Sequence, residues 1–152
     1  MMKKIWMKEE NVVELYECIN LILNRTQSAV HVYFKEKLTP FDVTPIQYSL
    51  LKCLWDNDMQ TPTMLAQALQ MDASTVTGLI ERLERKNLIA REYSMEDRRS
   101  ISIRLTPEGK SLQPGVEATI QQANLEAMRG LTDEQAAAFK RACALIQENV
   151  RR

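Results

Sequence analysis

Residues 72–90 read DASTVTGLIERLERKNLIA, and this stretch decides the fold. Its apolar residues recur at helical spacing, at Val76, Leu79, Ile80 and Leu83, which predicts one buried face. The opposite face carries short hydroxyls, a glycine and arginines, at Ser74, Thr75, Thr77, Gly78, Arg82 and Arg85. Asp72 and Ser74 are both candidate N-caps, and Asn87 suits the left-handed residue that ends a helix. We predict a helix over 73–86.

Two shorter helices are expected before it. Thr44-Pro45-Ile46-Gln47 combines a Thr N-cap, a proline in the first turn and the Gln of a capping box, which predicts a helix over 45–57. Thr61-Pro62 opens a helix over 62–70 in the same way. Met71-Asp72 then leaves room only for a tight turn.

After the helix over 73–86, the repeat of apolar residues changes from 3.6 residues to 2. Residues 100–105, SISIRL, alternate between apolar and polar and predict a half-buried strand, with which 89–94 can pair. The connector 95–99 is charged, so the hairpin should project into solvent. Two helices joined by a tight turn and followed by a two-stranded ribbon form a winged helix-turn-helix.

Long helices flank this unit. Apolar residues at helical spacing predict a first helix over 11–38. Thr106-Pro107 begins another helix, which Pro114-Gly115 should kink or interrupt, and a capping box over 132–135 begins a last helix that runs to about Asn149. The expected fold class is mostly α with a small β-hairpin (α+β).

Composition excludes several classes of protein. The chain has 152 residues, 45% hydrophobic and 26% charged, which fits one folded domain. No apolar run approaches the roughly 18 residues of a membrane span, and the first ten residues lack a secretory signal, so we expect a cytoplasmic protein without a membrane partner. A single histidine, three unpaired cysteines and four glycines outside phosphate-binding patterns argue against a metal, a cofactor and an enzyme.

Net charge is zero, so any basic surface must be local. Residues 72–105 carry seven positive and six negative side chains, whereas 1–43 and 107–152 each balance six against six. The hydroxyl face of 73–86 suits the major groove of DNA, and Arg98 and Arg99 at the hairpin tip could reach a minor groove. A solvated helix followed by a charged turn is the alternative.

The amino-acid sequence of the winged helix-turn-helix region resembles the MarR family of bacterial transcriptional regulators. The resemblance is dense over 44–110 and rests on Leu83-Glu84-Arg85-Lys86-Asn87-Leu88-Ile89, Asp97-Arg98-Arg99 and Leu105-Thr106-Pro107-Glu108-Gly109. Asn87 departs from the usual glycine of the family. The resemblance implies a single domain over 1–152, with a DNA-binding lobe over 44–106 and interleaved dimerisation helices over 10–38 and 107–150.

The resemblance also implies partners. They are a second copy of the chain and double-stranded DNA with a pseudo-palindromic operator, in a bacterial or archaeal cytoplasm. Family members are repressors, less often activators, released by a small molecule or by cysteine oxidation. We therefore expect a repressor released by a small aromatic or phenolic effector. The alternatives are a regulator that responds to cysteine oxidation, a DNA-binding protein without effector, and a winged helix that docks another protein.

Site residues follow from the matched positions. The resemblance places Ser74, Thr75, Thr77 and Arg82 against DNA, and we add Thr63, Gly78 and Arg98. Arg99 matches the wing arginine of the family. Asp72 and Asp97 match acidic positions that orient such arginines, although Asp72 can equally serve only as a cap.

Effector residues are less sharply defined. Tyr48 and Trp55 lie on the helix that, with the first and fifth helices, lines an apolar cleft in the family; the alternative is core packing. His31 is a further effector candidate or simply an exposed residue. Cys18 is a redox candidate, but Asn20, Phe34 and Pro45 stand where redox-sensing relatives carry the cysteine and its two tyrosines, which favours an unreactive thiol.

Overall fold

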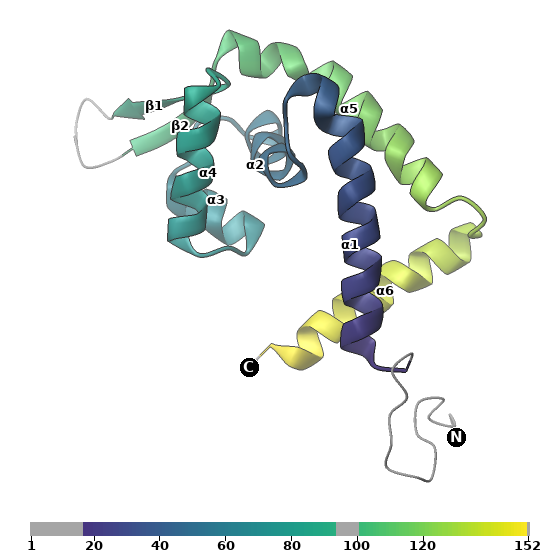
Figure 1. Cartoon of the computed structure of the whole chain (residues 1–152). Coiled ribbons are helices and arrows are strands. Elements are labelled where there is room, and N and C mark those ends of the chain that lie inside the picture. Colours follow the sequence, from purple (N-terminus) through teal and green to yellow (C-terminus); the bar gives the residue numbers. More distant parts are fainter. Residues whose placement is uncertain (1–16, 94–100, 152) are drawn as a thin grey trace.

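The computed structural model describes residues 17–93 and 101–151. Six α-helices, one short 3-10 helix and two strands follow one another along this part of the chain (Figure 1). Their order is α1 (Ile19–Leu38), η1 (Thr39–Phe41), α2 (Pro45–Asp56), α3 (Pro62–Leu69), α4 (Ala73–Arg85), β1 (Ile89–Tyr93), β2 (Ile101–Leu105), α5 (Pro107–Ala127) and α6 (Asp133–Val150). The mostly helical class with one β-hairpin is confirmed.

Side-chain caps set the starts of five helices. The caps each accept a hydrogen bond from the backbone N–H three residues on, and they are Thr44, Thr61, Asp72, Thr106 and Thr132. The capping boxes of α2 and α6 are both present, as expected. Asn87 has a φ of 57° just after α4, which confirms its left-handed role.

The first helix begins later than its apolar stripe indicated. We expected it from Asn11; residues 11–16 lie outside the described residues, and α1 starts at Ile19, after Cys18 in extended backbone. The Cys18 side chain makes no capping hydrogen bond. Because this end carries no local capping signal, apolar spacing alone could not locate it.

We expected Pro114-Gly115 to kink or interrupt the fifth helix, and the interruption is wrong. α5 runs unbroken from Pro107 to Ala127 with Pro114 inside it, and Figure 1 shows it as one continuous curved helix. A Cβ on Gly115 would lie 2.9 Å from the Phe41 ring, so this glycine lets α5 approach η1 closely. Val116 and Ile120 are buried just beyond it, and this packing holds the helix together across the missing hydrogen bond.

One apolar core unites the winged helix-turn-helix. Its fully buried side chains come from α2, α3, α4 and the hairpin, and include Leu50, Leu54, Leu65, Leu83 and Ile103. β1 and β2 pair antiparallel, with Ile89 opposite Leu105. Figure 1 shows this hairpin on one side of the molecule, away from α1 and α6.

The flanking helices bury much less. α1 and α5 meet around Leu38, Val116 and Ile120, whereas none of the described residues of α6 is buried. Large apolar side chains remain exposed on α1 and α6, among them Ile19, Val32, Phe139, Leu145 and Val150. Within the described residues, no helix has the length and apolar character that a membrane crossing requires.

Candidate nucleic-acid interface

The two faces of α4 are chemically distinct. Val76, Leu79, Ile80 and Leu83 are buried, and the expected DNA-facing residues Ser74, Thr75, Thr77 and Arg82 are exposed. A Cβ built on Gly78 would meet nothing within 4 Å, so packing within the chain does not require a glycine there. The helix therefore presents an exposed strip of hydroxyls that ends in arginines.

Asp72 organises the start of this strip. Its Oδ1 accepts the Thr75 backbone N–H at 2.9 Å and the Ser74 hydroxyl at 2.5 Å, while Oδ2 accepts the Thr75 hydroxyl at 2.6 Å. These bonds stabilise the carboxylate, and they hold the pKa of Asp72 well below its usual range. The capping role of Asp72 is confirmed, and its role in orienting Arg99 stays a prediction.

A shallow hollow of about 350 Å³ separates the exposed edges of α3 and α4. Thr63 lines it from α3 and Thr77 from α4, together with Gln67 and Gln70. The structure thus brings Thr63 to the same surface as the α4 hydroxyls. Gln67 and Gln70 are polar neighbours that the sequence analysis did not single out.

The hairpin carries its own charge pairs. Arg104 on β2 lies 3.1 Å from Glu92 on β1, and Arg91 lies 3.5 Å from Glu84 of α4. Asp97, Arg98 and Arg99, which we expected at the tip, lie outside the described residues.

Asp58 and Gln60, which both precede α3, accept hydrogen bonds from the backbone of β2, and neither was expected from the sequence. The Ile103 N–H donates to the Gln60 carbonyl at 2.8 Å, and the buried Gln60 amide donates to the carbonyls of Cys53 and Asn57. Asp58 accepts the Leu105 N–H at 2.9 Å. Neither contact has a local sequence signal, because the partners lie more than 40 residues apart in the chain.

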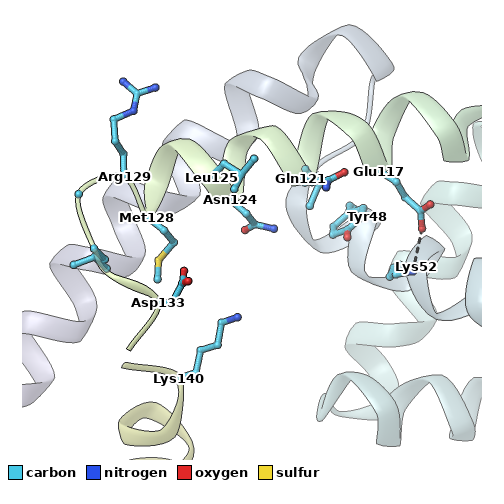
Figure 2. Close-up of a pocket in the computed structure, with 13 residues that line it drawn as sticks. Tyr48, Lys52, Glu117, Gln121, Asn124, Leu125, Met128, Arg129, Asp133 and Lys140 are labelled. Atoms are coloured by element: carbon cyan, nitrogen blue, oxygen red, sulfur yellow. Dashed lines mark hydrogen bonds and ion pairs between the residues drawn. The ribbon is translucent and has the colours of Figure 1, made fainter. Parts of the chain in front are cut away.

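A separate cavity of about 750 Å³ lies between α2, α5 and the start of α6. Figure 2 shows Tyr48 and Lys52 on one side of it, Met128 and Asp133 on the other, and Lys140 pointing toward the space between them. Its walls therefore differ from the expected cleft, because α6 replaces α1.

The three effector candidates are not brought together. Tyr48 lines this cavity. Trp55 instead packs against the core of the winged helix-turn-helix and against the apolar contact between α1 and α5. Its indole N–H donates to the Gly109 carbonyl at 2.9 Å. His31 is exposed on α1 and does not line the cavity. The geometry thus favours the core-packing alternative for Trp55 and the exposed alternative for His31.

Ion pairs connect the helices around the cavity. The Lys52 ammonium lies 2.5 Å from Asp56 and 3.0 Å from Glu117 of α5, and these carboxylates raise the pKa of Lys52. On the other side of α5, Glu126 accepts the Tyr33 hydroxyl and pairs with Lys37 at 3.0 Å. Hydrogen bonds from the Tyr33 hydroxyl, the Gln122 amide and the Lys37 ammonium lower the pKa of Glu126 to about 2.

The cysteines show no arrangement for chemistry. Cys18, Cys53 and Cys143 are free and partly buried, and Cys18 lies just before α1. Burial raises the pKa of the Cys53 thiol, which lowers its thiolate fraction.

Known transcriptional regulators are similar to this chain in sequence and in fold. The model of the MarR family matches residues 43–101. The chain is 31% identical over 101 residues to the HTH-type transcriptional regulator MgrA of Staphylococcus aureus, covering 66% of this chain and 69% of that protein. It is 35% identical over 80 residues to the organic hydroperoxide resistance transcriptional regulator of Bacillus subtilis, which covers 53% of this chain and 54% of that protein.

Solved structures agree with the fold. The transcriptional repressor CouR, bound to a 23-mer DNA duplex, superposes with a TM-score of 0.82 at 26% identity and covers 92% of this chain and 99% of its own. BpsR of Bordetella bronchiseptica, whose DNA binding is regulated by 6-hydroxynicotinic acid, superposes with a TM-score of 0.77 at 24% identity, over 85% of this chain and 98% of its own. The chain belongs to the MarR family of winged helix-turn-helix transcriptional regulators.

Proposed function

We propose that this regulator binds a pseudo-palindromic DNA operator as a homodimer and represses transcription until a small aromatic molecule releases it. The observation that carries the proposal is the exposed strip of α4, where Ser74, Thr75, Thr77 and Arg82 lie on a helix whose other face is buried. Short side chains let a helix approach base edges closely, and arginine adds charge for phosphates. CouR, a repressor bound to duplex DNA, has the same fold and supports this role.

A second copy is the proposed cover for the flanking helices. Phe139 is 48% exposed, Leu145 57% and Val32 56%, which is costly for side chains of this size in a lone chain. The proposed division is a DNA-binding lobe over 44–106 and dimerisation helices over 10–38 and 107–150. A two-fold dimer would place its two α4 helices in successive major grooves, with half-site centres about 10 base pairs apart.

The proposed effector site is the cavity between α2, α5 and α6. Its volume of about 750 Å³ lies within the range of small-molecule sites. Tyr48, Leu125 and Met128 offer apolar surface, and Lys140 offers a positive charge. An anionic aromatic molecule fits this chemistry, and BpsR, regulated by 6-hydroxynicotinic acid, supports effector control in this fold.

Operator binding is tested by fluorescence anisotropy on duplexes taken from the DNA that flanks the gene. We expect an inverted repeat to bind about a thousandfold more tightly than the same duplex with scrambled half-sites. Equal affinity for the two duplexes at physiological salt would refute operator recognition.

Effector control is tested by reciprocity. Aromatic carboxylates are first screened by thermal shift, because a ligand that binds the native state raises its stability. A hit that weakens operator binding must bind more weakly, by the same factor, when operator is present. Lys140→Gln should reduce the affinity of an anionic hit, whereas Lys35→Gln, which lies outside the cavity lining, is the matched control.

A further inference from the structure

Three exposed hydroxyls of α4 each donate a hydrogen bond within the protein. The Ser74 hydroxyl donates to Asp72 Oδ1 at 2.5 Å, and the Thr75 hydroxyl donates to Asp72 Oδ2 at 2.6 Å. The Thr77 hydroxyl donates to the Ala73 carbonyl at 2.8 Å. These three side chains are the ones that face the proposed DNA site.

The direction of these bonds is set by the acceptors. An ionised carboxylate and a backbone carbonyl have no proton to give, so the hydroxyl must be the donor in each pair. The bonds to Asp72 keep this carboxylate ionised at neutral pH, because they lower its pKa. A hydroxyl has one proton, and once that proton is committed only its oxygen lone pairs remain available outside.

A hydroxyl that offers only its oxygen lone pairs can hydrogen-bond only to donor groups of DNA. In the major groove the hydrogen-bond donors are the exocyclic amino groups, N6 of adenine and N4 of cytosine. Guanine N7 and O6, thymine O4 and the phosphate oxygens are acceptors, so they offer no hydrogen to such a hydroxyl.

We infer that Ser74, Thr75 and Thr77 act as acceptors which recognise the amino groups of adenine and cytosine, and that Asp72 is the positioning residue that sets this polarity. The inference rests on the proposed operator binding and adds the chemical class of base edge that the helix reads. Phosphate contacts are then left to nitrogen donors such as Arg82.

Asp72→Asn tests the polarity with little change of shape. The Asn Oδ1 can still accept the Thr75 N–H and the Ser74 hydroxyl, so the cap is retained. The Asn Nδ2 then occupies the place of Oδ2 and donates to the Thr75 oxygen, which frees the Thr75 proton. Thr75 becomes a donor toward DNA.

The experiment is selection of bound duplexes from a library randomised across the operator half-site, with wild type and Asp72→Asn. For wild type we expect adenine or cytosine at the base that Thr75 contacts. For Asp72→Asn we expect the preference at that one position to change to guanine or thymine, by about tenfold. Preferences are compared between sequences within one protein, so a smaller folded fraction does not affect them.

Thr75→Val in the native Asp72 background is the second variant. It keeps the side-chain shape and removes the acceptor, so the preference at the same position should fall by about tenfold, while the other positions keep theirs. An unchanged base preference in Asp72→Asn or in Thr75→Val would overturn the inference. If wild type selects no sequence at all, the proposed operator binding itself fails, which is a different result.

Discussion

The indole N–H of Trp55, near the end of α2, donates to the carbonyl oxygen of Gly109, in the first turn of α5, at 2.9 Å. The start of α5 is also joined to the connection between α4 and β1, because the Thr106 N–H donates to the Leu88 carbonyl and the Thr106 hydroxyl to the Asn87 carbonyl. The Leu105-Thr106-Pro107-Glu108-Gly109 motif is therefore the junction between the winged helix-turn-helix and α5.

Gly109→Ala should strongly destabilise the protein. A Cβ at this position would lie 2.0 Å from the Leu88 carbonyl oxygen and 3.3 Å from Leu105 Cδ2, so the backbone would have to move. We expect the free energy of unfolding to fall by about 3 kcal/mol, as in overpacked cores. Urea denaturation followed by circular dichroism measures this change.

Gly78→Ala is the matched control for the same substitution in a helix. Its Cβ would meet nothing within 4 Å, so the alanine should raise the free energy of unfolding by about 0.5–1 kcal/mol. Because Gly78 lies on the proposed DNA face, the same variant should bind operator more weakly. If Gly78→Ala lost as much stability as Gly109→Ala, crowding of the Cβ by Leu88 would not explain the effect at Gly109.

The Glu126 cluster should make stability depend on acidic pH. The Tyr33 hydroxyl, the Gln122 amide and the Lys37 ammonium lower the pKa of Glu126 from 4.5 to about 2 in the folded state. A lowered folded-state pKa gives stability that is present above pH 4.5 and is lost as the pH falls toward 2. Glu126→Gln should therefore lose less stability than wild type over this interval.

Thermal unfolding between pH 6 and pH 2 measures the difference between the two proteins. Glu148→Gln, a substitution of a described exposed carboxylate on α6, is the control and should follow wild type. Parallel curves for Glu126→Gln and wild type would show that the cluster does not contribute.

The apolar face of α6 should be needed for dimerisation. Phe139→Glu places a charge on a side chain that is 48% exposed in the single chain and that we expect a partner to cover. We expect sedimentation to show monomers at micromolar concentration and operator affinity to fall at least tenfold. Arg141→Glu lies about 200° further round the helix and should remain a dimer.

The wing prediction concerns Arg99, which lies outside the described residues. Arg99→Ala should weaken operator binding by about 1–3 kcal/mol if the guanidinium enters a groove. An equal loss of affinity for all DNA sequences would instead indicate a phosphate contact. In that case the slope of log affinity against log salt concentration should also fall by about one. Arg104→Ala, whose side chain pairs with Glu92, is the control and should change affinity much less.

Much of the fold could be predicted because its signals are local. Thr44, Thr61, Asp72 and Thr132 cap their helices within three residues of chain, and the alternation of 101–105 predicts a strand without knowledge of its neighbours. The identity of the exposed face of α4 followed in the same way from the spacing of its buried residues.

Tertiary structure decided what depends on residues far apart in the chain. Pro114 did not interrupt α5, because packing around Phe41 and Val116 outweighs one missing hydrogen bond. The cavity joins Tyr48 to Met128, and the hairpin base joins Asp58 to Leu105. The sequence by itself determined the helices, the strands and the exposed hydroxyls, since these arise from neighbours along the chain. Only the folded chain determined the cavity and the contacts at the base of the hairpin, since these arise from neighbours in space.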